Sequence, residues 1–203
     1  RRFILVQLPE PLNCGAKDQK VGAEYCAKIG KPAVLTEITK ERLRRSAETI
    51  KKEKKKYQGD VGFRVFKLDS SNIQAWEADR DHIETSIDAA LEHLKKDRTE
   101  EDILFELLLK LGLDLTTPID SKEIAGKRVY SVGFGALLVC LAEKISSKEV
   151  ESLGLGIVEW HKELSPAGDS NVVFRDSAFS DDVSKTNMTA ILQQYGLEKV
   201  SSL

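Results

Sequence analysis

The chain opens on an apolar run at residues 3–6, Phe-Ile-Leu-Val, and this run constrains the fold more than any other stretch. A run without a polar face is typical of a strand covered on both sides, as in a parallel α/β sheet. Pro9 and Pro11 stop the strand and leave Glu10 in the loop at its carboxyl end. Open α/β sheets bind ligands at that end, and an acid there accepts hydrogen bonds from the ribose hydroxyls of a nucleoside cofactor. The position predicts Glu10 as a cofactor ligand, with an ordinary polar loop residue as the alternative.

Composition sets wider limits on the class of protein. The chain has 203 residues, enough for one domain or two small ones, and it begins without methionine or a charged leader, so we expect the downstream part of a longer protein. A formal net charge of -2 gives no global attraction for nucleic acid, so any basic surface is local. No apolar run approaches the ~20 residues that cross a bilayer, and three widely spaced cysteines fit reduced thiols. We expect a soluble, cytoplasmic protein with no membrane attachment.

A helix and a second strand follow the opening run. An amphipathic helix is predicted to start at Thr36 or Thr39 and to end near residue 57, and residues 61–69 predict a strand that again ends in an acid, Asp69. Two strands joined by a helix form a βαβ unit and are parallel. Glu10 and Asp69 are therefore expected at the same edge of one sheet.

The predicted helix carries a local excess of positive charge. Residues 37–56 contain nine lysines or arginines and four glutamates. Such a face makes salt-sensitive phosphate contacts that do not read sequence, or else it is a solvated face crossed by acid-base pairs. The lack of interleaved aromatic residues favours the second interpretation.

The remainder of the chain predicts helices followed by a second α/β unit. A helix capped by Thr99 carries an apolar stripe over residues 103–111 and ends at Gly112. The other elements are expected as a helix near residues 83–94, strands near 128–132, 136–141 and 172–174, helices from Ser146 or Ser147 to Gly154 and from 181 to 195, and a last strand within 197–203.

Four stretches carry a resemblance to a known family. They are ITKERLRR at residues 38–45, GFRVFKLDSSNIQAW at 62–76, LLLKLGLDLT at 107–116 and VVFRDSAF at 172–179. In this order they resemble the modification subunit of type III restriction-modification systems, a family of S-adenosylmethionine-dependent DNA adenine-N6 methyltransferases. The match spans nearly the whole chain.

The resemblance implies an α/β fold with three parts. Residues 1–76 would form a partial Rossmann-like methyltransferase sheet, residues 77–116 a helical connection, and residues 117–203 a small carboxyl-terminal α/β subdomain. Glu10 would bind the ribose of S-adenosylmethionine, and Asp69 would approach its adenine amino group. For Asp69, capping the next turn through the two serines that follow is the alternative.

The family's glycine-rich cofactor loop and its Asp-Pro-Pro-Tyr-type catalytic motif do not occur in these residues. No catalytic residue is therefore assigned, and the chain by itself is expected to be inactive. The turn-like Gly133-Phe134-Gly135 is followed by a strand-like run and does not fit the cofactor loop.

The resemblance also implies partners, namely DNA, a restriction subunit and a second copy of the chain. The alternative function is a non-catalytic assembly or dimerisation module that uses the apolar stripe and the terminal subdomain. Arg175, Asp176 and Ser177 follow a predicted strand and either bind a ligand or close the loop, the commoner use. His82 and His93 have no close acid pair and are expected to be surface residues, so no metal site is assigned. His161 has no visible nucleophile or acid partner that would make a catalytic set.

Overall fold

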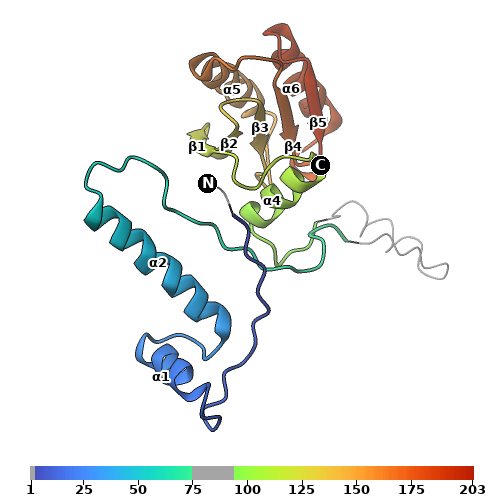
Figure 1. Cartoon of the computed structure of the whole chain (residues 1–203). Helices are drawn as coiled ribbons and strands as arrows, with labels where there is room; N and C mark the ends of the chain where they lie inside the picture. The colour runs from blue at the N-terminus through green and yellow to red at the C-terminus, as the bar shows by residue number, and fades with distance from the viewer. Residues whose placement is uncertain (1–2, 75–93) are drawn as a thin grey trace, which may run out of the picture. The chain divides into compact units, whose positions relative to one another are not determined.

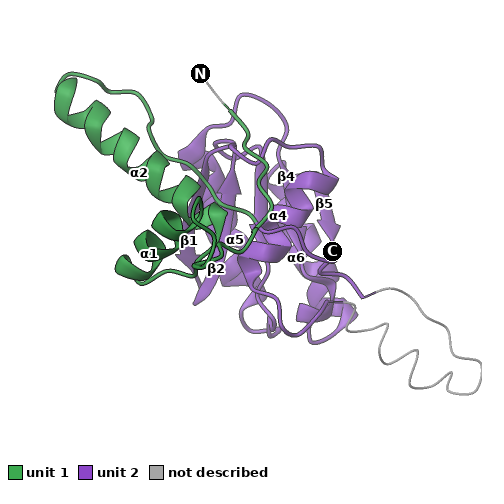
Figure 2. Cartoon of the chain, turned by 60° about the horizontal axis from the view of Figure 1, so that its bottom comes forward, with its two compact units in different colours: residues 1–66 green, residues 67–203 purple. Residues whose placement is uncertain are grey.

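The computed structural model describes residues 3–74 and 94–203 and divides the chain into two compact units, Arg1–Phe66 and Lys67–Leu203 (Figures 1 and 2). Across these described residues the fold is mixed α/β, as predicted, with five helices and one five-stranded sheet. The helix predicted near residues 83–94, together with His82 and His93, lies outside the described residues. Among the described helices, none combines the length and the apolar character needed to span a membrane.

The first unit contains two helices, α1 (Lys20–Lys28) and α2 (Leu35–Glu53). The Tyr25 hydroxyl joins them, because it donates to Glu41 (3.3 Å) and accepts from Arg45 (2.5 Å), whose guanidinium also lies 5.1 Å from the tyrosine ring centroid. A backbone bridge between Pro11 and Val34 closes the connection in front of α2. The predicted helix forms as α2, but it ends at Glu53 and not near residue 57. It begins at Leu35 without a side-chain cap, so neither threonine has the expected capping role.

The strands predicted at the start of the chain and at residues 61–69 are absent, and the second of these segments crosses from the first unit into the second. Residues 3–8 and 61–69 belong to no helix or strand, and Ile4, Val6 and Leu68 are almost fully exposed. The prediction was wrong because a strand exists only when its backbone groups pair with a neighbour, and residues 3–66 offer one isolated bridge instead of a sheet. The βαβ unit therefore does not form within the described residues.

The second unit has a sheet in the order β1-β2-β3-β4-β5. The strands are β1 (Ile119–Ile124), β2 (Lys127–Val132), β3 (Leu137–Cys140), β4 (Asn171–Phe174) and β5 (Lys199–Ser202). The first three form an antiparallel meander, whereas β3, β4 and β5 are parallel. Helix α5 (Val150–Leu164) joins β3 to β4, and α6 (Asp182–Gln194) joins β4 to β5 after a short 3-10 turn, η1 (Asp176–Ala178).

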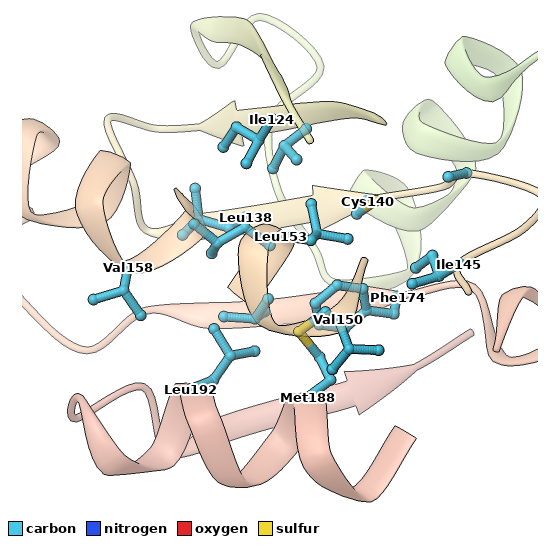
Figure 3. Packing of buried hydrophobic residues seen from close by; sticks show 14 of the residues in the cluster. Ile124, Leu138, Cys140, Ile145, Val150, Leu153, Val158, Phe174, Met188 and Leu192 are labelled. Carbon is cyan, nitrogen blue, oxygen red and sulfur yellow. The ribbon is translucent and has the colours of Figure 1, made fainter. Parts of the chain in front are cut away.

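Helices cover both faces of this sheet. Leu138, Cys140 and Phe174 point to the face packed against α5 and α6, where Met188 and Leu192 meet them (Figure 3). The alternate residues of the same strands point to the opposite face, which packs against α4 (Glu100–Lys110). The unit is thus a three-layer body, and α4, expected in a helical connection, supplies one of its layers.

Local sequence signals explain most of the ends of these elements. Thr99 and Asp102 form a capping box at the start of α4, Asp181 caps α6 through the Ser184 N–H (2.6 Å), and Gly112 and Gly196 follow the two helices with positive φ. Gly133-Phe134-Gly135 is a turn, as predicted, with positive φ at all three residues.

Gly154 does not end a helix, contrary to prediction, because α5 continues to Leu164. An added Cβ at Gly154 would lie 3.0 Å from the Ile191 side chain of α6, so this glycine permits close packing of two helices. Ser146 precedes α5 and donates its N–H and hydroxyl to the Glu149 carboxylate, at 2.8 and 2.6 Å, instead of opening the helix.

Candidate functional site

Glu10 lies in an exposed loop of the first unit. Its backbone N–H donates to the Leu8 carbonyl (2.9 Å), and its carbonyl accepts the N–H of Leu35, the first residue of α2 (3.0 Å). The backbone of Glu10 is thus fixed at the beginning of α2, and its carboxylate makes no hydrogen bond or ion pair with a described residue. This carboxylate is available to a ligand, but it does not follow a strand as the sequence predicted.

Asp69, the second predicted ligand, belongs to the second unit and is engaged locally. One carboxylate oxygen accepts the N–H of Ser70 (2.6 Å), and the other accepts Nη1 of Arg98 (2.9 Å). The Arg98 hydrogen bond, followed by the Ser70 N–H, lowers the pKa of Asp69 to about 2. The turn-capping alternative is confirmed through Ser70, whereas Ser71 has a different partner.

The partner of Ser71 is Glu106 on α4. Its carboxylate accepts the Ser71 hydroxyl (2.5 Å) and the Asn72 N–H (2.6 Å), while the Asn72 side-chain amide donates to the Asp102 carbonyl (2.9 Å). Burial acts to raise the pKa of Glu106, but the hydrogen bonds from Ser71 and Asn72 outweigh it, and the pKa lies below its ordinary value. Residues 69–72 are therefore held at two places, by Arg98 just before α4 and by Glu106 and the Asp102 carbonyl on α4 itself.

The Asp69 ion pair predicts an acid-dependent loss of stability. We expect Asp69→Asn to lower the urea midpoint at pH 6, and this deficit to shrink as pH falls from the ordinary pKa of 3.8 towards about 2. The sign follows because a depressed pKa in the folded state stabilises the fold only while the carboxyl stays ionised. The measurement is urea unfolding of both proteins across this pH range. Asp120→Asn, at an exposed edge-strand position, is the control, and a deficit independent of pH would refute the assignment.

The positive charge of α2 is distributed unevenly. In its first half, Glu37 pairs with Lys40, and Glu41 pairs with Arg44 (3.6 Å) and Arg45 (2.9 Å). These pairs lower the pKa of both glutamates, chiefly through the hydrogen bonds from Lys40 and Arg45. The solvated, ion-paired interpretation is therefore confirmed for the first half of the helix. Its carboxyl end is different: within the described residues, the five lysines at positions 51–56 have no ion pair.

Other candidates from the sequence have structural partners. Arg175 donates to the Ser177 hydroxyl (2.9 Å), and Asp176 pairs with Lys185 of α6, so this trio closes a loop. His161 lies 2.9 Å from the hydroxyl of Ser170, a partner that the sequence did not indicate. Burial lowers the pKa of this histidine, and the partner of its ring is a hydroxyl instead of the carboxylate of a catalytic triad.

The cysteines are separate in the structure. Cys26 and Cys140 are buried, Cys14 is exposed, and all three are free thiols. Burial raises the pKa of Cys140 to about 11, which makes it an unreactive core residue. Over residues 3–74 and 94–203, histidine, cysteine and acidic side chains form no group of three that could hold a metal ion.

Comparison of the chain with protein-family models, with curated proteins and with solved structures found no match.

Proposed function

We propose that the chain is the carboxyl-terminal part of a site-specific DNA adenine-N6 methyltransferase of a type III restriction-modification system. In this proposal residues 3–8 complete a Rossmann-like sheet supplied by another part of the protein, and Glu10 holds the ribose of S-adenosylmethionine. The intact enzyme transfers a methyl group to an adenine nitrogen in the cytoplasm. The chain alone is inactive, because it contains neither the glycine-rich loop nor the Asp-Pro-Pro-Tyr-type motif.

The single observation that carries this proposal is the state of residues 3–8. Their sequence is that of a strand buried on both faces, yet Ile4 and Val6 are 90% and 92% exposed. Exposed apolar residues and unpaired backbone groups in one segment are the signature of a strand that lacks its neighbours. The segment is therefore best explained as one strand of a sheet whose other strands come from outside the described residues.

Glu10 suits the cofactor role once residues 3–8 pair in this way. The ligand edge of a parallel sheet is formed by the loops after the strands, and Glu10 is in the loop immediately after this one. Its backbone is held by Leu35, while its carboxylate has no competing partner within the described residues. A carboxylate with both oxygens available matches the two ribose hydroxyls. Asp69 is the weaker candidate, because Arg98 and Ser70 already engage both of its oxygens.

The proposed partners follow from the same role. DNA is the methyl acceptor. The second unit, which has its own sheet and core, is the candidate contact for a restriction subunit or for a second methyltransferase subunit. Its sheet has two edge strands, β1 and β5, and β1 is exposed along most of its length.

Amide hydrogen exchange tests the proposed pairing of residues 3–8. We expect these amides to exchange at unprotected rates in the 203-residue chain and to be strongly protected in the complete product of its gene, because ladder hydrogen bonds slow exchange. The amides of β3 should be protected in both proteins. Unprotected exchange of residues 3–8 in the complete product would contradict the proposal. Protection that rises with the concentration of the 203-residue chain would favour the alternative assembly module, with the segment paired between two copies.

A further inference from the structure

The proposed cofactor role leaves one strongly charged surface unexplained. We call it the lysine cluster, and it consists of residues 51–57, Lys-Lys-Glu-Lys-Lys-Lys-Tyr, at the carboxyl end of α2. Five positive charges and one negative charge lie within six consecutive residues of a chain whose net charge is -2. All seven residues are exposed, and residues 52–57 surround a shallow hollow that is open to solvent.

Ion pairing does not neutralise the lysine cluster. In the first half of α2, Lys40, Arg44 and Arg45 form ion pairs with two glutamates, but no described residue forms an ion pair with any lysine of the cluster. Five ammonium groups so close together repel one another, and this repulsion is relieved by an anion.

Stabilisation of the helix dipole accounts for only part of the lysine cluster. Cations in the last turn of a helix interact favourably with its carboxyl end, and Lys51 and Lys52 fill that role. The other three lysines, residues 54–56, lie beyond Glu53, where α2 has ended. Their side chains donate to no backbone carbonyl of residues 3–74 or 94–203, so capping within this part of the chain does not explain them.

The composition of the lysine cluster selects the class of polyanion. Binding to a membrane surface would require an apolar face. Protein interfaces are depleted in lysine and rely on apolar or arginine anchors. Neither partner fits, because Tyr57 is the one large apolar or aromatic residue in the cluster. Single-stranded nucleic acid would require several stacking aromatics. A regular double-stranded phosphate backbone needs only point charges, and lysine supplies these.

We propose that the lysine cluster binds the phosphate backbone of duplex DNA without reading its sequence. In choosing DNA over double-stranded RNA, this inference rests on the proposed function. The cluster holds DNA beside the enzyme through salt-sensitive contacts, while base recognition belongs to other parts of the protein. If all five lysines contact phosphates, the logarithm of the observed association constant falls linearly with the logarithm of the salt concentration. This surface alone then contributes a slope with a magnitude of about 4 to 5.

The test compares three variants of the 203-residue chain by fluorescence anisotropy with a labelled duplex of arbitrary sequence, over a series of salt concentrations. The first variant changes all five cluster lysines to glutamine. The matched control changes five exposed lysines elsewhere to glutamine and so has the same net charge as the first variant. These are Lys17, Lys28, Lys67, Lys144 and Lys148. A third variant changes the cluster lysines to arginine, which keeps the charge. Circular dichroism verifies that each variant retains its helices.

We expect the glutamine variant to bind DNA roughly 100-fold more weakly at low salt and to reduce the salt slope by about 4. The control and the arginine variant should retain most of the slope. Equal binding by the glutamine variant and the wild type would overturn the proposal, and so would an equal loss in the control, because net charge would then be responsible. Equally tight binding of poly-glutamate or of phosphatidylserine vesicles would also overturn it. Methyl transfer plays no part in this assay, so its outcome is separate from that of the proposed function.

Discussion

Phe174→Ala should lower the free energy of unfolding of the second unit by about 3–5 kcal/mol, the range for deleting a buried phenylalanine. Phe174 ends β4, an interior strand of the sheet, and is 2% exposed. Its ring packs edge-on against Phe179, with centroids 5.6 Å apart, and lies in the layer between the sheet and helices α5 and α6 (Figure 3). Because strands and helices enclose the site, the protein cannot collapse fully around the missing ring, and a cavity remains.

Phe134→Ala is the matched control for this prediction. Phe134 is in the turn between β2 and β3 and is 63% exposed, so its removal should change stability little. Urea unfolding of both variants, followed by circular dichroism, measures the difference. A loss below about 1 kcal/mol for Phe174→Ala, or equal losses for the two variants, would contradict the described core.

Glu10→Ala should weaken S-adenosylmethionine binding by the complete gene product by about 100-fold or more. In the proposed site the carboxylate accepts two ribose hydroxyls, and hydrogen bonds to charged groups contribute about 1.5–3 kcal/mol each. Loss of both therefore costs at least about 3 kcal/mol, and every 1.4 kcal/mol is tenfold in affinity. Isothermal titration calorimetry gives the affinity directly.

Two further variants sharpen this test of Glu10. Glu10→Gln keeps one acceptor oxygen and should lose less affinity than the alanine variant. Asp18→Ala removes another exposed acid of the same unit and should bind the cofactor normally. An unchanged affinity in Glu10→Ala would remove the ribose assignment, whatever the enzyme's activity.

Local signals in the sequence predicted the second unit well. Capping boxes, glycines after helices and short apolar strands are properties of neighbouring residues, and the structure places α4, α6, β2, β3, β4 and β5 where these signals occur. Strand β1 was missed because its sequence, Ile-Asp-Ser-Lys-Glu-Ile, is that of a polar edge strand, mostly exposed. It is specified by pairing with β2 through a two-residue turn at Ala125 and Gly126, both with positive φ.

Interactions between distant residues set the limits of prediction elsewhere. The partner of Asp69 is Arg98, 29 positions away, and the partner of Asn72 is Glu106, 34 positions away, and no periodicity links them. The strands predicted at the start of the chain and at residues 61–69 failed for the same reason, because an apolar run specifies a buried strand only in the presence of its sheet. Gly154 was taken as a helix end because its contact with Ile191 of α6 is invisible in the sequence.

The most direct test of the proposed methyltransferase is transfer of a tritiated methyl group from S-adenosylmethionine to DNA. The complete gene product should label DNA, and digestion of the DNA should yield N6-methyladenine as the labelled base. The 203-residue chain should transfer nothing under the same conditions. Labelling of DNA by the 203-residue chain, or an absence of N6-methyladenine with the complete product, would contradict the proposed function.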